Sequence, residues 1–174
     1  MLLALALGSS CSTTACLVAD APTYGPPQKI PPVIKFDEVV PPPNRQLVKM
    51  DSTSLRLDVP LRSEDAGDDL LGVLWLDCCE EPRAKYFDQL ELPASSFDQQ
   101  RVFQMVWQPD ERVVKGCHAL SLLLMHTESF DSNSQSNLPK AGAWSDVAVV
   151  TWWVNYLPDD PSVAVNCPTS AVSP

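Results

Sequence analysis

Apolar and polar residues alternate with a period of two along parts of this chain. Residues 55–61 alternate in this way, and residues 101–107 place Phe103 and Trp107 on the same side. This period is typical of a β-strand with one buried face. Pro60 cannot donate a ladder hydrogen bond, so the first of these strands is expected to end there or to lie on an edge.

Four further stretches predict strands from their composition. Residues 70–77 form a short apolar run, as expected of a central strand that is buried on both faces. Residues 116–126 and 146–156 are rich in aliphatic, β-branched and aromatic side chains and predict the two strongest strands. Residues 86–92 fit a weak strand or a helical turn.

Short strands without any segment of period 3.6 predict an all-β fold for residues 46–160. We expect an antiparallel β-sandwich of about seven strands, and this architecture resembles that of immunoglobulin and fibronectin type III domains. The polar residues 127–144 predict a long hairpin loop between the last two strands. Trp75 and Trp153 are expected in the core, and Trp152 on the opposite face, partly exposed.

The N-terminus carries an apolar run followed by small residues, which is the pattern of a secretory signal peptide over residues 1–15. Cys16 follows the small residues and resembles the lipidated cysteine of the bacterial lipoprotein lipobox, with Cys11 as the alternative. The resemblance implies a lipid anchor in the bacterial cell envelope. Val18 stands where an Asp would favour inner-membrane retention, so the outer membrane is expected. A plain cleaved signal peptide and a buried N-terminal strand are the alternatives.

Proline is frequent in residues 16–45 and predicts a disordered tether behind the anchor. Proline fixes φ and favours extended backbone, so such a segment can hold a domain away from a membrane. The other interpretation is a ligand for aromatic grooves. Residues 161–174 are expected to form a C-terminal tail.

The chain is acidic, with 22 Asp and Glu against 12 Lys and Arg and a formal net charge of −10. A protein that binds nucleic acid needs a basic surface, so this charge argues against such a partner. It also argues against polybasic attraction to a membrane, which leaves the lipid anchor as the expected membrane contact.

Four cysteines remain after the leader: Cys78, Cys79, Cys117 and Cys167. In an exported chain this number predicts two disulfides. A bond between the neighbours Cys78 and Cys79 would be strained, so each is expected to reach one of the other two. One of these bonds would then hold the C-terminal tail. A zinc or redox site is the alternative.

No motif in the sequence predicts catalysis, a cofactor or a metal site. His118 and His126 share one predicted strand, but eight residues separate them by about 26 Å, so they cannot form one site. Residues 131–137 lack the glycine and glutamate positions of an EF-hand, and the acidic turn at 64–69 would hold calcium weakly. No G-x-S-x-G motif occurs.

The sequence therefore favours a binding or scaffolding module whose partner is another envelope protein. One alternative is an envelope hydrolase whose site lies in the loop at 127–144. Another is a carbohydrate-binding module that uses Trp144, Trp152 and Tyr156 as surface aromatics.

Overall fold

The computed structural model describes residues 29–45, 47–49, 54–78, 85–95, 99–132, 137–156 and Cys167. Within these residues the secondary structure comprises eight strands and two short 3₁₀ helices: β1 (Val33–Ile34), β2 (Leu47–Lys49), β3 (Leu55–Arg62), β4 (Leu70–Leu76), β5 (Lys85–Leu92), β6 (Gln100–Trp107), β7 (Gly116–His126), η1 (Thr127–Ser129), η2 (Ala143–Asp146) and β8 (Ala148–Tyr156). None of the described helices has the length and apolar character needed to cross a bilayer.

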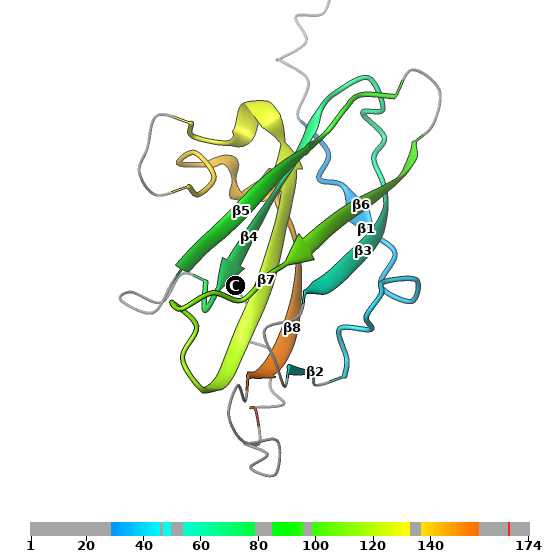
Figure 1. Ribbon diagram of the computed structural model, residues 1–174. Helices are drawn as coiled ribbons and strands as arrows, with labels where there is room; N and C mark the ends of the chain where they lie inside the picture. Colours follow the sequence, from blue (N-terminus) through cyan, green and yellow to red (C-terminus); the bar gives the residue numbers. More distant parts are fainter. Residues whose placement is uncertain are drawn as a thin grey trace, which may run out of the picture.

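The strands form two sheets that pack as a β-sandwich (Figure 1). The smaller sheet has the order β1-β3-β6, and the larger has the order β2-β8-β7-β4-β5. All neighbours are antiparallel except β2, which pairs parallel to β8. The all-β antiparallel sandwich expected from the sequence is therefore confirmed.

The side-chain pattern of each strand follows its place in the sandwich. In β6 buried and exposed residues alternate without exception, because one face meets the core and the other meets solvent. Every residue of β4 is buried, because β4 lies between β5 and β7 and both of its faces are covered. Its outer face packs in a second apolar cluster with Phe130, and Leu138 from the β7–β8 connection packs against this cluster.

The main core lies between the two sheets and includes the largest fully buried side chains, Trp107, Trp152 and Phe103. Trp152 is buried and Trp153 is only half-buried, so the expected orientation of these two residues was wrong. Antiparallel pairing with β7 sets Trp152 opposite Leu120, which faces the core. Trp75 is buried as expected, although it lies on the outer face of the large sheet.

Pro60 lies inside β3, which continues to Arg62 between β1 and β6, so the expectation of a strand end or edge was wrong. The Pro60 carbonyl accepts a hydrogen bond from the Lys35 amide, on the side of β1. The missing donor of Pro60 therefore faces β1 and not β6. The Lys35 carbonyl, which would face that donor, instead accepts a hydrogen bond from the Glu38 amide in the turn after β1, so no ladder bond is lost.

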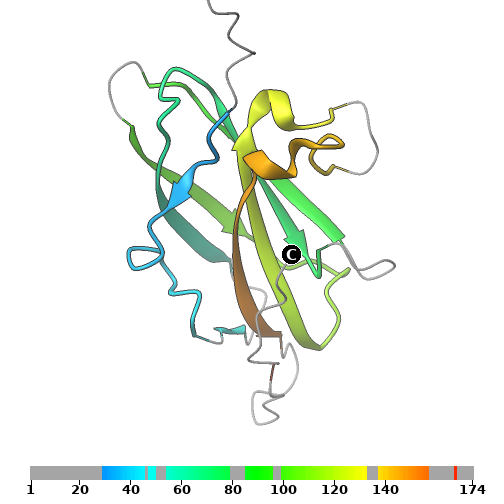
Figure 2. The same ribbon diagram turned by 180° about the vertical axis from the view of Figure 1, so that it is seen from behind.

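Part of the segment expected to be a tether packs on the sandwich (Figure 2). β1 pairs with the end of β3, Val39 is 2% exposed, and the Val40 amide and carbonyl both bond to Asp58. The Trp152 indole donates to the Pro41 carbonyl at 2.7 Å. The sheet therefore begins well before residue 46, whereas residues 16–28 of the expected tether lie outside the described residues.

Cys117 and Cys167 form a disulfide with 5.4 Å between their Cα atoms. The expected pairing of each of them with Cys78 or Cys79 was therefore wrong. Cys117 lies opposite Asn155 near the end of β8, so the chain that leaves β8 starts beside Cys117. Cys78 is also disulfide-bonded. Cys79 lies outside the described residues.

Candidate functional site

A cluster of polar side chains occupies the end of the sandwich where β7 ends and β8 begins. The hairpin register pairs Leu124 with Ala148, and its continuation sets His126 opposite Asp146. His126 is 1% exposed and Asp146 is 5% exposed. Antiparallel pairing thus brings together two groups that are 20 residues apart in the chain.

The Asp146 carboxylate is the centre of this cluster. It accepts hydrogen bonds from His126 Nδ1 at 2.6 Å, from the His126 amide at 3.1 Å and from Ser129 Oγ at 2.5 Å. A buried carboxylate needs such donors to offset the loss of water. Asp146 therefore ties the end of β7 and the turn of η1 to the start of β8.

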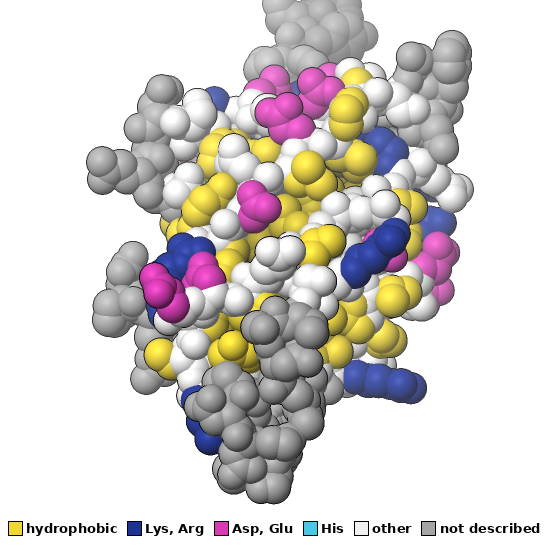
Figure 3. Space-filling model, in the orientation of Figure 1, with side chains coloured by type: hydrophobic (Ala, Val, Ile, Leu, Met, Phe, Trp, Pro, Cys, Tyr) yellow, Lys and Arg dark blue, Asp and Glu magenta, His cyan; other side chains and the backbone are white. Residues whose placement is uncertain are grey.

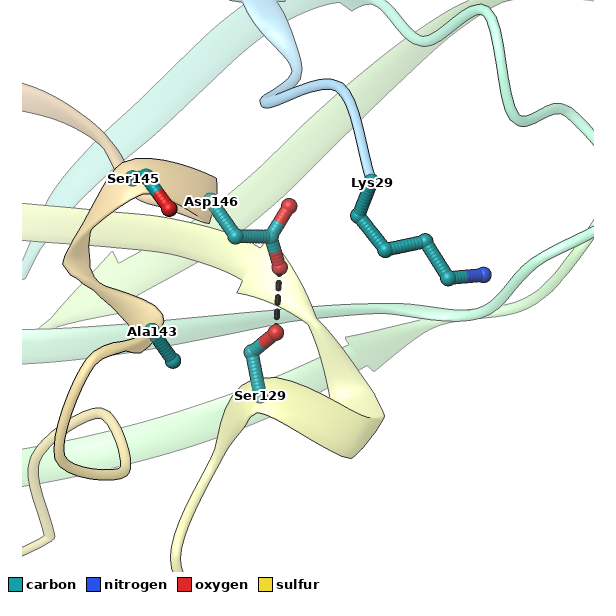
Figure 4. Close-up of a pocket in the computed structure, with 5 residues that line it drawn as sticks. All are labelled: Lys29, Ser129, Ala143, Ser145 and Asp146. Atoms are coloured by element: carbon teal, nitrogen blue, oxygen red, sulfur yellow. Dashed lines mark hydrogen bonds between the residues drawn. The ribbon is translucent and has the colours of Figure 1, made fainter. Parts of the chain in front are cut away.

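Two shallow pockets open beside this cluster. The first, of about 410 Å³, is lined by Lys29, Ser129, Ala143, Ser145 and Asp146. In the close-up, Asp146 points toward Ser129, whereas the Lys29 amine extends away from it (Figure 4). The second pocket, of about 390 Å³, borders His126 and also contacts Lys29.

Lys29 forms an ion pair with Asp68, and its amine lies 3.4 Å from Glu128. The hydrogen bond to Asp68 raises the pKa of Lys29, and the same bond lowers the pKa of Asp68. Both side chains are partly exposed, so this pair is expected to add little stability. Its main effect is to attach the segment before β1 to the turn between β3 and β4.

Two buried groups at this end of the sandwich keep unused hydrogen-bonding atoms. His126 Nε2 has no hydrogen-bond partner among the described residues, and the nearest Asp65 oxygen is 3.6 Å away. Arg101 donates through Nη1 to the carbonyls of Asp68 and Pro93, while its Nε and Nη2 are unpaired within the same part of the chain. Burial lowers the pKa of Arg101.

The hydrogen bonds of this cluster do not follow the order found in serine hydrolases. In those enzymes the serine bonds to the imidazole, which removes the serine proton. Here Ser129 donates to the Asp146 carboxylate, and His126 holds the same carboxylate through Nδ1. The arrangement favours a structural role in closing the hairpin.

A second histidine–carboxylate pair lies at the other end of β7. His118 Nδ1 bonds to Asp77 at 2.8 Å, and Nε2 bonds to the Val114 carbonyl at 2.8 Å. Both acceptors require a protonated nitrogen, so the geometry favours the imidazolium. Burial lowers the pKa of His118, but the bonds to Asp77 and Val114 outweigh this effect and raise the pKa above its usual value.

The aromatic residues proposed as a carbohydrate surface do not form one. Trp152 is 0% exposed, Tyr156 is 7% exposed, and both belong to the core between the sheets. Trp144 is 46% exposed and lies in η2. An exposed platform for a sugar ring would need at least a second accessible aromatic, and these two candidates are buried.

The acidic turn at 64–69 is held by protein donors. Asp65 accepts from the Ile30 amide at 3.2 Å, and Asp69 accepts from the Ala94 amide at 2.6 Å. In the part of the chain that the structure describes, no group of three or more His, Cys, Asp or Glu side chains is placed to hold a metal ion. The loop at 131–137 lies only partly within the described residues, and Cys11 and Cys16 lie outside them.

The sequence interpretation missed the pairing of His126 with Asp146, although the sequence contained a signal for it. Two strong strands joined by one loop form a hairpin, and only a few registers set their apolar residues in pairs. The observed register places His126 and Asp146 opposite each other, just beyond the last ladder pair. A histidine at the end of one strand and an aspartate at the start of the next could therefore have predicted this pair.

The fold and this cluster define a disulfide-bonded β-sandwich with a polar, pocketed end. No protein-family model matches the chain, and no curated protein matches it either.

Proposed function

We propose that this chain is a lipid-anchored protein of the bacterial cell envelope whose β-sandwich binds another envelope protein. The anchor is Cys16, with Cys11 as the alternative, and the membrane is the outer membrane. The Cys117–Cys167 disulfide supports export, because such bonds persist in oxidising compartments such as the bacterial periplasm. This support is independent of the leader sequence.

The observation that carries the binding role is an exposed apolar surface over the small sheet. We call it the outer patch, and it consists of Val33, Phe36, Val40, Val102 and Val106, which are 46% to 58% exposed. Four of these residues belong to or pair with the strands β1, β3 and β6, and Phe36 lies in the turn after β1. Grouped apolar side chains of this kind mark interaction surfaces.

Two arginines flank the outer patch on β3. Arg56 lies opposite Val106 in the sheet, and Arg62 lies opposite both Val33 and Gln100. Arginine is enriched in protein interfaces, where it binds carboxylates at the rim. The surface therefore fits a protein partner with an apolar centre and an acidic rim.

Photocrosslinking in the native envelope tests the binding role. A photoreactive residue in place of Phe36 is expected to give a covalent adduct with a second protein, which mass spectrometry identifies. The same residue in place of the exposed Gln89, on β5 of the other sheet, is the control. Equal adduct patterns at the two positions would contradict the proposed surface.

The intact mass of protein extracted from native membranes tests the anchor. Cleavage before Cys16 with added acyl groups is the expected result. A mass without acyl groups would refute the anchor and would leave the binding role of the outer patch to be judged by crosslinking.

A further inference from the structure

The free edge of β6 presents unpaired backbone groups. β6 ends the small sheet, and no described strand pairs with it on the side away from β3. In β3, backbone groups of Asp58 and Pro60 form hydrogen bonds to the N-terminal segment. Successive residues of a strand direct their backbone groups to opposite sides, so the odd-numbered residues 57, 59 and 61 form hydrogen bonds to β6. Their partners in β6 are the odd-numbered residues 101, 103 and 105. The amides and carbonyls of Val102 and Gln104 therefore point away from the sheet, as do those of Val106.

From Val102 to Val106 this edge carries few of the features that normally prevent strand pairing. Edge strands are usually protected by charged side chains, proline or bulges. The solvent-facing side chains of β6 are uncharged: Gln100, Val102, Gln104 and Val106. The charged Arg101 points inward at the start of the strand, and no register shift interrupts the ladder of β6 with β3. β5, one of the two edges of the large sheet, carries Lys85 and Asp88 and lies beside a register shift. Among the described residues, the β6 edge is thus more open to a further strand than the β5 edge is.

We propose that two copies of this chain pair through their β6 edges, antiparallel and around a two-fold axis at Gln104. In this register Gln104 faces Gln104 of the second copy, and Val102 faces Val106 of the second copy. Each of these residues exchanges both backbone hydrogen bonds with its counterpart, at the Cα separation of about 5.5 Å typical of such pairs. The proposal does not rest on the binding role of the outer patch, although Val102 and Val106 belong to both: their side chains lie in the patch and their backbone groups form the edge.

The charge of the chain favours a second copy at this edge over other contacts between copies. At a net charge of −10, two copies repel each other unless they meet through a neutral surface. Hydrophobic side chains spread over the face on which β5 and β6 lie, with Lys and Arg mostly at its margins and a few Asp and Glu among the hydrophobic ones (Figure 3). The sequence of side chains Val102, Gln104, Val106 is the same in either chain direction. An antiparallel second copy therefore sets valine opposite valine and glutamine opposite glutamine along the edge. A two-fold contact uses both free β6 edges and stops at a dimer.

Substitution of Gln104 tests the pairing, because the axis sets each new charge opposite its own copy. Gln104→Lys and Gln104→Glu alone are each expected to weaken the dimer by up to about fivefold at low ionic strength, since like charges then meet. An equal mixture of the two variants is expected to restore a heterodimer. Sedimentation equilibrium of the purified full chain measures all of these states.

Gln89→Lys and Gln89→Glu on β5 are matched controls and are expected to leave the dimer unchanged. Amide hydrogen exchange of wild type gives a second readout, in which Val102, Gln104 and Val106 become protected as concentration rises. Three results would overturn the proposal: a wild-type monomer, a dimer that survives both Gln104 substitutions, or a mixture of the two variants that does not reassociate. If the β6 edge pairs with a strand of another protein instead, the purified wild type will be a monomer, which is the first of these results.

Discussion

Gly72 of β4 lies against the ring of Phe103 in the opposite sheet, and its replacement by alanine tests the packing of the core. A Cβ atom at this position would lie 2.1 Å from Cζ of Phe103 and 2.5 Å from Cε2. Phe103 is 0% exposed, so its ring has core atoms on every side. The ring cannot swing into solvent to make room.

The expected cost of Gly72→Ala follows from these distances. Carbon atoms in contact are separated by about 3.5–4.0 Å, so the Phe103 ring must retreat by roughly 1.5 Å. Such overpacking costs about 1–3 kcal/mol. Alanine is better than glycine in a strand by about 0.5–1 kcal/mol, which offsets part of the cost. We therefore expect a net loss of about 1–2 kcal/mol in the free energy of unfolding.

Urea denaturation measures this loss, with Gly67→Ala as the control. A Cβ at Gly67 meets no atom within 4 Å, so that variant is expected to match wild type. Phe103→Leu removes the ring atoms that the new methyl group meets, so the double variant with Gly72→Ala should be more stable than the sum of the two single effects predicts. Equal stability of the two alanine variants, or strict additivity in the double variant, would refute the reasoning.

Three further predictions concern the ends of the sandwich and its disulfide. The pKa of His118 is raised by folding, so its protonation stabilises the folded state fully at a pH below the unfolded pKa of 6.5. Wild type should therefore be more stable than His118→Gln at low pH, and this difference should vanish as the pH rises through the folded pKa. Urea denaturation across pH measures the difference. Trp152→Phe should lower the free energy of unfolding by about 1–3 kcal/mol, since it removes a buried hydrogen bond and core volume. Trp144 is exposed, so Trp144→Phe should change the same quantity by less than about 0.5 kcal/mol. Thermal unfolding of the two variants measures both changes. Joint replacement of Cys117 and Cys167 by serine should lower the free energy of unfolding by about 4 kcal/mol, which is the loop-entropy value for a sequence separation of 50 residues. Urea denaturation measures this loss.

The strands were predictable because their patterns differ from those of helices and loops. β6 has one face in the core, so its sequence alternates and shows which side chains are buried. β7 begins and ends at the residues expected from its apolar run. Both elements are specified by local composition, and their antiparallel order follows from short connections.

The orientation of β8 was not predictable in the same way. Its central residues are apolar on both faces, since the outer face of the large sheet is covered by the β7–β8 connection. A strand without alternation does not show which of Trp152 and Trp153 faces the core. Pairing with β7 decides this, and that pairing is a property of the whole sheet.

The disulfide pairing depended on the same three-dimensional information. Local strain at two neighbouring cysteines suggested where a bond would not form, but it did not show which distant cysteine lies near which strand. The place of Cys117 beside the end of β8 is set by the hairpin register. A chain that leaves β8 can return to that point, which brings Cys167 within bonding distance.

The two histidines show how the hairpin is held at both ends. They have the same parity on β7, so both point toward the sandwich interior, where the apolar core gives way to solvent. Each finds an aspartate from a neighbouring segment: Asp77 follows β4 and also accepts the Ala119 amide, and Asp146 precedes β8. An apolar side chain in place of either histidine would remove one donor, although Asp77 would keep the Ala119 amide and Asp146 would keep Ser129 Oγ. The pairs therefore close the two ends of the core, whereas the contacts that we propose with other chains use the outer patch and the edge of β6.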